Sequence, residues 1–182
     1  IRYITNVSAL DATQVSGLSS TQVRGLSSGQ VAALTETDIG ELTSTQITGL
    51  TPTQLSALST TSLSALDATQ MGALSGTQLR GMSTTQVRAL STTDIGELST
   101  TQIGALTSTQ MGALTTTVIS ALTTTQMTGL STTQIPGLTT TQIDYLSTTN
   151  ISALSFSQAE AFTTTQVQSL DNDQIVAYLN IT

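Results

Sequence analysis

The sequence predicts an all-α solenoid of very short helices, one in each eight-residue repeat. The octad runs without insertion or deletion from residue 3 to residue 178, which gives 22 units. Each unit carries residues that begin a helix, and its two large apolar positions are three residues apart. One octad cannot fold alone, because burying two side chains does not offset the cost of ordering eight residues. The units must therefore stack on one another.

The first four positions of the octad predict a helix N-terminus. Position 1 is Ser, Thr or Asp in 21 of the 22 units, Tyr3 being the exception, and position 4 is Gln in 16. This S/T-x-x-Q pattern is a capping box, in which two side chains satisfy free N–H groups at the start of a helix. Pro52 falls at position 2, the N1 site where proline is tolerated. Asp38 and Asp94 replace Gln where a negative charge suits the helix dipole.

Positions 5 and 8 predict one buried face. Position 5 is apolar in every unit, and position 8 is Leu in 19 of the 22. Residues three apart share a face of a helix, whereas in a strand they point to opposite faces. The leucine before the N-cap and the apolar residue at N4 also match a hydrophobic staple. Runs such as TTTQI nevertheless have β propensity, and a β-solenoid is the alternative architecture.

The end of the octad predicts that each helix stops early. Position 7 is Gly or Ala in 18 units, which suits a C-terminal turn and a close approach of neighbouring backbones. Pro136 at position 6 lacks the N–H group that a longer helix would need. We therefore expect helices of about one to one and a half turns, partly 3₁₀ in character.

A longer period of seven octads overlies the first. Residues 11–66 and 67–122 are identical at 35 of 56 positions, and both contain TDIGEL, at 37–42 and 93–98. A third block, 123–178, keeps the octad but differs in detail. A recent duplication explains this period. The alternative is that seven octads bring the chain back to the same azimuth of a superhelix, with a turn of about that size.

The C-terminal part of the chain differs from the middle. Phe162, Tyr178 and the tail LNIT predict a cap over about residues 155–182 of a single array that spans residues 1–182. An end-to-end contact with another copy is the other interpretation. Because the chain begins at Ile1, we expect a processed product or a section of something longer.

Composition excludes several classes of partner. Only 8% of the residues are charged, the formal net charge is −7, and the four basic residues are all Arg. This shortage of cations argues against binding nucleic acid or anionic membrane surfaces. No run approaches the ~18 apolar residues of a membrane span, so we expect no insertion into a membrane.

Catalytic chemistry is not expected. The chain has no His, Cys or Lys, so the usual general bases and thiol nucleophiles are missing. We predict no enzyme activity, no catalytic, cofactor-binding or metal-binding residues, and no cofactor. The paired carboxylates of TDIGEL, Asp38 with Glu41 and Asp94 with Glu97, have two interpretations. One is a weak Ca²⁺ or partner contact; the other is a capping Asp beside a solvated Glu that faces Arg88.

Two resemblances extend this interpretation. LSTTQIGAL, residues 98–106, is one octad with the leucine that precedes it, and it resembles the LTTxQhxAL tracts of very large bacterial surface and secreted proteins, including RTX-type and adhesin-like proteins. That resemblance implies an extracellular position, a spacer or matrix role and no catalysis. LTPTQL, residues 50–55, resembles the opening of TAL-effector repeats. The base-reading pair of those repeats has no counterpart here, so DNA binding is not implied.

The leading hypothesis is a structural protein of a bacterial surface or matrix, either a stalk or spacer or a self-assembling fibre subunit. Identical interfaces on both ends of a repeat extend in one dimension and give filaments if nothing closes them. The expected partner is therefore a second copy, in a homopolymer formed through end-to-end or lateral solenoid contacts. The alternative is a binding module that uses its Thr and Ser columns to order ice or to carry O-linked sugar, as in a glycosylated adhesin segment.

Overall fold

The computed structural model describes residues 11–182, and the first predicted octad, residues 3–10, lies outside the described residues. Residues 11–182 contain twenty short α-helices, one 3₁₀-helix and no strand. The predicted all-α repeat solenoid is confirmed, and the β-solenoid alternative is wrong. The helices α1 to α19 have four to six residues each, because the next N-cap follows eight residues after the last.

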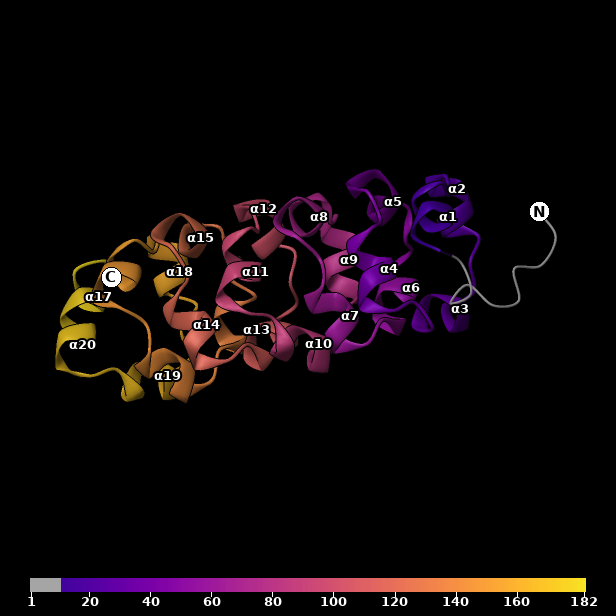
Figure 1. The fold of residues 1–182 in the computed structure, drawn as a ribbon. Helices are drawn as coiled ribbons and strands as arrows, with labels where there is room; N and C mark the ends of the chain where they lie inside the picture. Colours follow the sequence, from indigo (N-terminus) through magenta and orange to yellow (C-terminus); the bar gives the residue numbers. More distant parts are fainter. Residues whose placement is uncertain (1–10) are drawn as a thin grey trace. The chain divides into compact units, whose positions relative to one another are not determined.

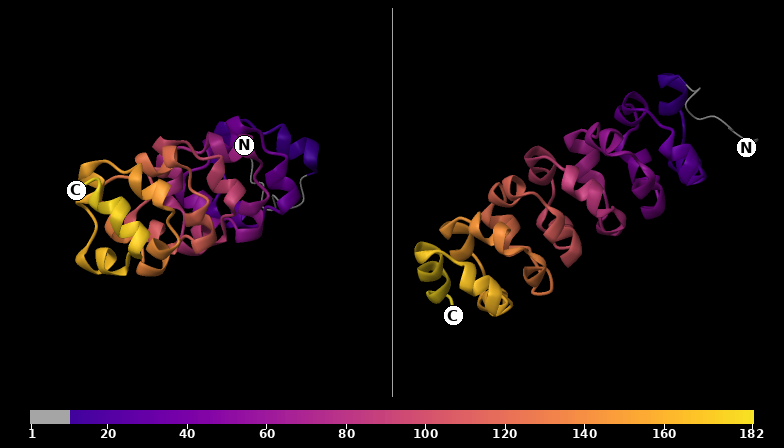
Figure 2. Two further views of the ribbon diagram at one scale, coloured as in Figure 1. Left: turned by 90° about the vertical axis from the view of Figure 1, so that its left-hand side faces the viewer. Right: turned by 90° about the horizontal axis from the view of Figure 1, so that it is seen from below.

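The chain divides into two compact units, one ending at Ala89 and the other beginning at Leu90. Figures 1 and 2 show the short helices of each unit and the extended links between them. The first unit contains α1 (Ala12–Ser16), α2 (Ser20–Arg24), α3 (Ser28–Ala32), α4 (Glu36–Gly40), α5 (Ser44–Gly49), α6 (Pro52–Ala57), α7 (Thr60–Ser64), α8 (Ala68–Ala73), α9 (Gly76–Gly81) and α10 (Thr84–Ala89).

The second unit repeats the same plan. It contains α11 (Thr92–Gly96), α12 (Thr100–Ile103), α13 (Ser108–Ala113), α14 (Thr116–Ser120), α15 (Thr124–Thr128), η2 (Ile135–Gly137), α16 (Thr140–Asp144), α17 (Thr148–Ser152), α18 (Phe156–Ala159), α19 (Thr164–Ser169) and α20 (Asn172–Leu179). The last helix, α20, is the longest of the described helices, with eight residues.

Each octad consists of a helix and an extended link. In α5, the N-cap Thr43 has φ −68° and ψ 158°, and its hydroxyl accepts a hydrogen bond from the Gln46 N–H. The Gln46 side chain accepts in turn from the Thr43 N–H, which completes the predicted capping box. The C-cap Leu50 returns to extended backbone at ψ 135°, and its N–H donates to the Ile47 carbonyl. The link therefore consists of positions 8 and 1.

Both prolines occupy the positions that their chemistry allows. Pro52 is the first residue of α6, where no intrahelical N–H is needed. Pro136 lies in η2, and here the octad forms a 3₁₀-helix in place of an α-helix. The predicted 3₁₀ character is thus observed at the one octad whose proline removes an interior donor.

The core consists of the two apolar columns. At position 5, Val15 to Ala159 are all 0–1% exposed, and from Leu34 to Leu154 the position-8 side chains are 2–5% exposed. In the C-terminal octads, Phe162 is 8% exposed, and its ring contacts the Tyr178 ring edge-on at 5.7 Å between centroids. The capping role of residues 155–182 stays a prediction.

Packing within each unit joins octads that are three places apart. In the first unit α5 packs on α2 and α8, and α6 on α3 and α9. The second unit shows the same spacing, with α12 on α15 and α17 on α20. A turn of the solenoid therefore takes up at least three octads.

Small residues at positions 6 and 7 allow these helices to come close. A Cβ built on Gly49 would lie 2.6 Å from the Ser20 carbonyl oxygen, and one on Gly81 would lie 2.5 Å from the Pro52 Cβ. The predicted close approach is therefore confirmed. The predicted C-terminal turn is also observed, since Gly17 and Gly25 are helix C-caps, and their φ values of −77° and −79° are ones that alanine adopts as well.

We predict that two position-6 glycines respond oppositely to alanine. A Cβ on Gly112 would lie 2.6 Å from the Gly137 carbonyl oxygen, whereas one on Gly96 meets nothing within 4 Å. Gly112→Ala should lower the free energy of unfolding by about 1–3 kcal/mol through overpacking. Gly96→Ala should raise it by about 0.5 kcal/mol through lower backbone entropy. Urea denaturation of both variants checks this, and equal effects would contradict the packing described.

Candidate functional site

The acidic TDIGEL motifs act as helix caps. Asp38 is buried and accepts hydrogen bonds from the Thr35 N–H and hydroxyl, both at 2.8 Å. Asp94 accepts from the Ser91 N–H at 2.7 Å in the same way. Within residues 11–182, no group of three or more Asp, Glu, His or Cys side chains is placed to hold a metal ion. The capping interpretation of both aspartates is thus confirmed.

The two glutamates of the motif differ from each other. Glu97 is exposed, as the solvated interpretation predicts. Glu41 is half-buried, and its Oε2 has no hydrogen-bond partner, so the prediction of a solvated side chain is wrong here. Both glutamates occupy position 7 of identical TDIGEL motifs, so the octad position alone does not decide whether this carboxylate is exposed. The predicted contact of the solvated glutamate with Arg88 stays a prediction.

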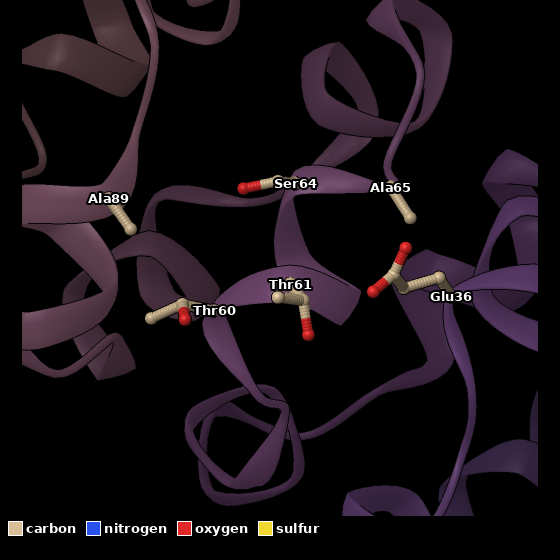
Figure 3. A pocket seen from close by; sticks show the side chains of 6 residues that line it. All are labelled: Glu36, Thr60, Thr61, Ser64, Ala65 and Ala89. Atoms are coloured by element: carbon tan, nitrogen blue, oxygen red, sulfur yellow. The ribbon is translucent and has the colours of Figure 1, made fainter.

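Figure 3 shows a hollow of about 280 Å³ in the first unit. Its lining comes from α4, α7, α10 and the residue after α7: Glu36, Thr60, Thr61, Ser64, Ala65 and Ala89. Glu36 is the one titratable side chain among these lining residues, and the hydroxyls lack an adjacent base and orienting group. The lining therefore does not form a nucleophile–base set.

No described helix has the length and apolar content that crossing a bilayer requires.

The most specific chemistry in the fold is a buried amide at position 4. In the second unit the Gln142 Nε2 donates to the Met111 and Leu114 carbonyl oxygens, at 2.9 and 2.7 Å. These acceptors precede Gln142 by 31 and 28 residues, so they lie at positions 5 and 8 of the octad four places earlier. We call a position-4 side chain with the two carbonyl groups that it binds an octad joint.

The same joint recurs along both units. In the first unit it is formed by Gln46 with Val15 and Leu18, Gln54 with Val23 and Leu26, Gln70 with Ile39 and Leu42, Gln78 with Ile47 and Leu50, and Gln86 with Leu55 and Leu58. In the second it is formed by Gln126 with Ile95 and Leu98, Gln134 with Ile103 and Leu106, Gln142 with Met111 and Leu114, Gln158 with Met127 and Leu130, Gln166 with Ile135 and Leu138, and Gln174 with Ile143 and Leu146.

The joints correct the predicted size of a superhelical turn. Helices pack three octads apart, and joints connect octads four apart, so one turn holds between three and four octads. A turn of about seven octads is therefore wrong. Two turns hold between six and eight octads, a range that includes the seven-octad block. The physical reason is that an octad buries its apolar side chains and pairs its backbone groups against octads of the adjacent turn, which lie three and four places away.

Both ends of the glutamine amide are used. The Gln142 Oε1 accepts from the Thr139 N–H at 2.7 Å, which is the capping box of its own helix. The Nε2 binds the octad four places earlier, so one side chain satisfies backbone groups in two octads. Gln142 is 2% exposed. A buried amide is tolerated only when its donors and acceptors are paired, and here they are.

Substitutions within the sequence show why glutamine is needed. Asn150 reaches one carbonyl, that of Leu122 at 2.9 Å, and its helix lacks the full capping box. Ser62 donates to the Leu34 carbonyl at 3.2 Å and likewise forms no full box. Val118 has no side-chain donor at all. A shorter side chain therefore keeps one connection at most, and only glutamine spans the cap and both carbonyls.

The octad sequence predicts one half of the role of this glutamine. The capping box is local and follows from S/T-x-x-Q, whereas the carbonyl acceptors lie 28 and 31 residues away. One feature of the sequence is consistent with the second half of the role: glutamine dominates position 4, although Glu forms a capping box equally well. A donor at the far end of the side chain explains that preference.

Comparison with known protein families agrees with this repeat. The profile of the ALTTAQ repeat matches residues 6–36, 63–100, 77–108, 108–140 and 119–156. The chain belongs to the ALTTAQ repeat family. Searches of curated proteins and of solved structures gave no match.

We predict that Gln142→Glu destabilises this ALTTAQ array. Glutamate can keep the bond from the Thr139 N–H, but it replaces the donor to Met111 and Leu114 with a buried negative charge. The free energy of unfolding should fall by about 2–5 kcal/mol. Chemical denaturation followed by circular dichroism measures this loss.

Gln22→Glu is the matched control, since its octad also has a capping box but its Nε2 has no acceptor among residues 11–182. This variant should unfold as the unmodified chain does. A similar loss in both variants would show that the capping box, and not the joint, carries the effect.

Proposed function

We propose that this ALTTAQ-repeat chain is a non-catalytic structural protein, a spacer or fibre subunit that acts outside a bacterial cell. The observation that carries the proposal is the recurrence of one joint along each unit. An octad satisfies its backbone and buries its apolar residues through octads three and four places away. Adding octads therefore adds the same contacts again, and such an array extends in one dimension.

The surface supports an inert role. The exposed side chains are mostly Thr and Ser, with few charges and no basic cluster in the sequence. Such a surface is hydrated without attracting nucleic acid. The extracellular, bacterial part of the proposal rests on the resemblance to the LTTxQhxAL tracts of large surface and secreted proteins.

A binding module is the second candidate, and one observation favours it. Position 3 is exposed in every described octad, and it is Thr in most of them. This column of hydroxyls is not used by the joints, which leaves it open to ordered water or O-linked sugar. Thermal hysteresis in solution, or a glycan mass on the natural product, would favour this candidate over the spacer.

We predict that the length of the protein increases with the number of octads. A second copy of residues 67–122 inserted after Leu122 keeps the octad register. It adds seven octads, five of which have a glutamine at position 4. The maximum dimension from small-angle X-ray scattering should rise in proportion to the added turns. An unchanged maximum dimension would contradict the spacer proposal.

The matched control is the same insertion with alanine at its five position-4 glutamines: Gln70, Gln78, Gln86, Gln102 and Gln110. This inserted block has the same number of residues but lacks side-chain donors at those positions. It should add residues without adding an ordered, helical segment, and circular dichroism of both proteins records the difference.

A further inference from the structure

Glutamine is replaced at position 4 in a regular series. Six octads of the sequence have another residue there: Asn6, Asp38, Ser62, Asp94, Val118 and Asn150. Successive members are four, three, four, three and four octads apart, and the series stops there, since Gln174 forms a full joint. One turn holds between three and four octads, so within each unit the replacements recur once per turn and lie along one side.

We call the replaced octads that lie in residues 11–182 the short-joint octads; they begin at residues 35, 59, 91, 115 and 147. The seven-octad duplication does not by itself explain them. Ser62 and Val118 occupy equivalent places in the two blocks but are different residues, and so are Asp94 and Asn150, which are also seven octads apart. The residue has changed between copies, yet none of the four is glutamine.

The joints are incomplete or missing at these octads. Asn150 binds one carbonyl with its Nδ2, where a glutamine binds two. An ionised Asp94 has only acceptor atoms, and Val118 has no polar side-chain atom. The carbonyls 28 residues before these two, those of Leu66 and Leu90, receive no hydrogen bond from any residue in 11–182. Adjacent turns are therefore connected by fewer hydrogen bonds on this side.

The turns also approach each other less closely at the short-joint octads. A Cβ on Gly40 would lie 3.8 Å from a carbonyl oxygen of the octad three places later, and one on Gly96 would meet nothing within 4 Å. Gly104 and Gly112 occupy the same position 6 in octads that have glutamine. A Cβ on either would lie 2.8 or 2.6 Å from the corresponding carbonyl oxygen. The wider spacing is thus confined to one class of octad among these glycines.

The hollow of Figure 3 lies on the same side of the first unit. Five of its six lining residues belong to the short-joint octads that begin at residues 35 and 59: Glu36, Thr60, Thr61, Ser64 and Ala65. Incomplete hydrogen bonding, a wider approach and a hollow therefore coincide there. We call the side of each unit that carries its short-joint octads the open side.

We propose that each unit bends by opening and closing its open side, with the glutamine joints of the other sides acting as the hinge. A segment with fewer tertiary hydrogen bonds opens at a lower cost in free energy. Because the incomplete joints recur once per turn, they let successive turns tilt in the same direction. Such bending goes beyond the spacer function, since a binding module with the same joints would bend in the same way.

Hydrogen exchange of backbone amides, followed by NMR in the full chain, tests where the connections are weak. The position-5 N–H is the probe, because it is bonded to the N-cap carbonyl of its own helix in the four octads compared. Ile119 and Ile151 are in short-joint octads, and Met111 and Ile143 are in the octads just before them. The first two should exchange about tenfold faster, as the loss of one or two hydrogen bonds would give.

A pair of substitutions moves the effect along the chain. Asn150→Gln should add the bond to the Ile119 carbonyl and slow exchange at Ile151 to the rate of Ile143. Gln142→Asn is the matched control, and it should transfer the fast exchange to Ile143. Equal exchange in all four octads would overturn the proposal, and so would exchange at Ile151 that Asn150→Gln does not slow.

Distances between spin labels test the direction of bending. The sequence has no Cys, so two introduced cysteines are the only labelling sites. Thr93→Cys/Thr117→Cys places labels on two short-joint octads, and Thr109→Cys/Thr133→Cys places them on two octads with glutamine. All four threonines are exposed, and each pair is three octads apart. The first pair should give the broader distance distribution, and Val118→Gln should narrow it.

Distributions of equal width for the two pairs would overturn the bending. So would a first distribution that Val118→Gln leaves unchanged while circular dichroism shows the variant to be folded. A uniformly stiff array would still lengthen as octads are added, so the scattering experiment on the inserted block tests the spacer function separately.

Discussion

The position-4 amide connects the local and the long-range order of this protein. A helix of five residues leaves most of its backbone N–H and C=O groups without intrahelical partners, and burying such groups without partners is costly. The capping box satisfies the N-terminal N–H groups from within the octad. The same glutamine satisfies carbonyl groups at the end of another octad, as Gln142 does for Met111 and Leu114. Helices this short persist because a side chain completes their hydrogen bonding.

This constraint explains several other features of the chain. A joint four octads away and a helix contact three octads away fix how far the chain rotates at each step. Backbones that approach this closely leave no space for side chains at some sites, as Gly49 and Gly112 show. Departures from the repeat are tolerated singly: Asn150 keeps one bond, and Val118 keeps only the hydroxyl cap of its helix. The neighbouring joints hold such an octad in place.

The local half of the architecture could be predicted from the sequence, and the long-range half could not. The helix start, the buried columns and the place of Pro52 follow from spacing, since they depend on residues three or four apart. The number of octads in a turn depends on how rigid octads pack, and the octad sequence contains no separate signal for it. The acceptors of Gln142 are backbone carbonyls, which every residue has, so no residue type marks them. Glu41 and Glu97 share position 7 of identical TDIGEL motifs, so the octad pattern cannot distinguish the half-buried side chain from the exposed one.

The side-chain amide protons of the glutamines offer the most direct measurement of this account. In a ¹⁵N-labelled sample, hydrogen exchange at Nε2 can be followed by NMR for each glutamine. The account predicts slow exchange for Gln142, Gln158 and Gln166, whose Nε2 groups are bound and buried. Gln14, measured in dilute solution, should exchange at the rate of a free amide. Equally fast exchange at all four glutamines would contradict the claim that buried amides hold the octads together.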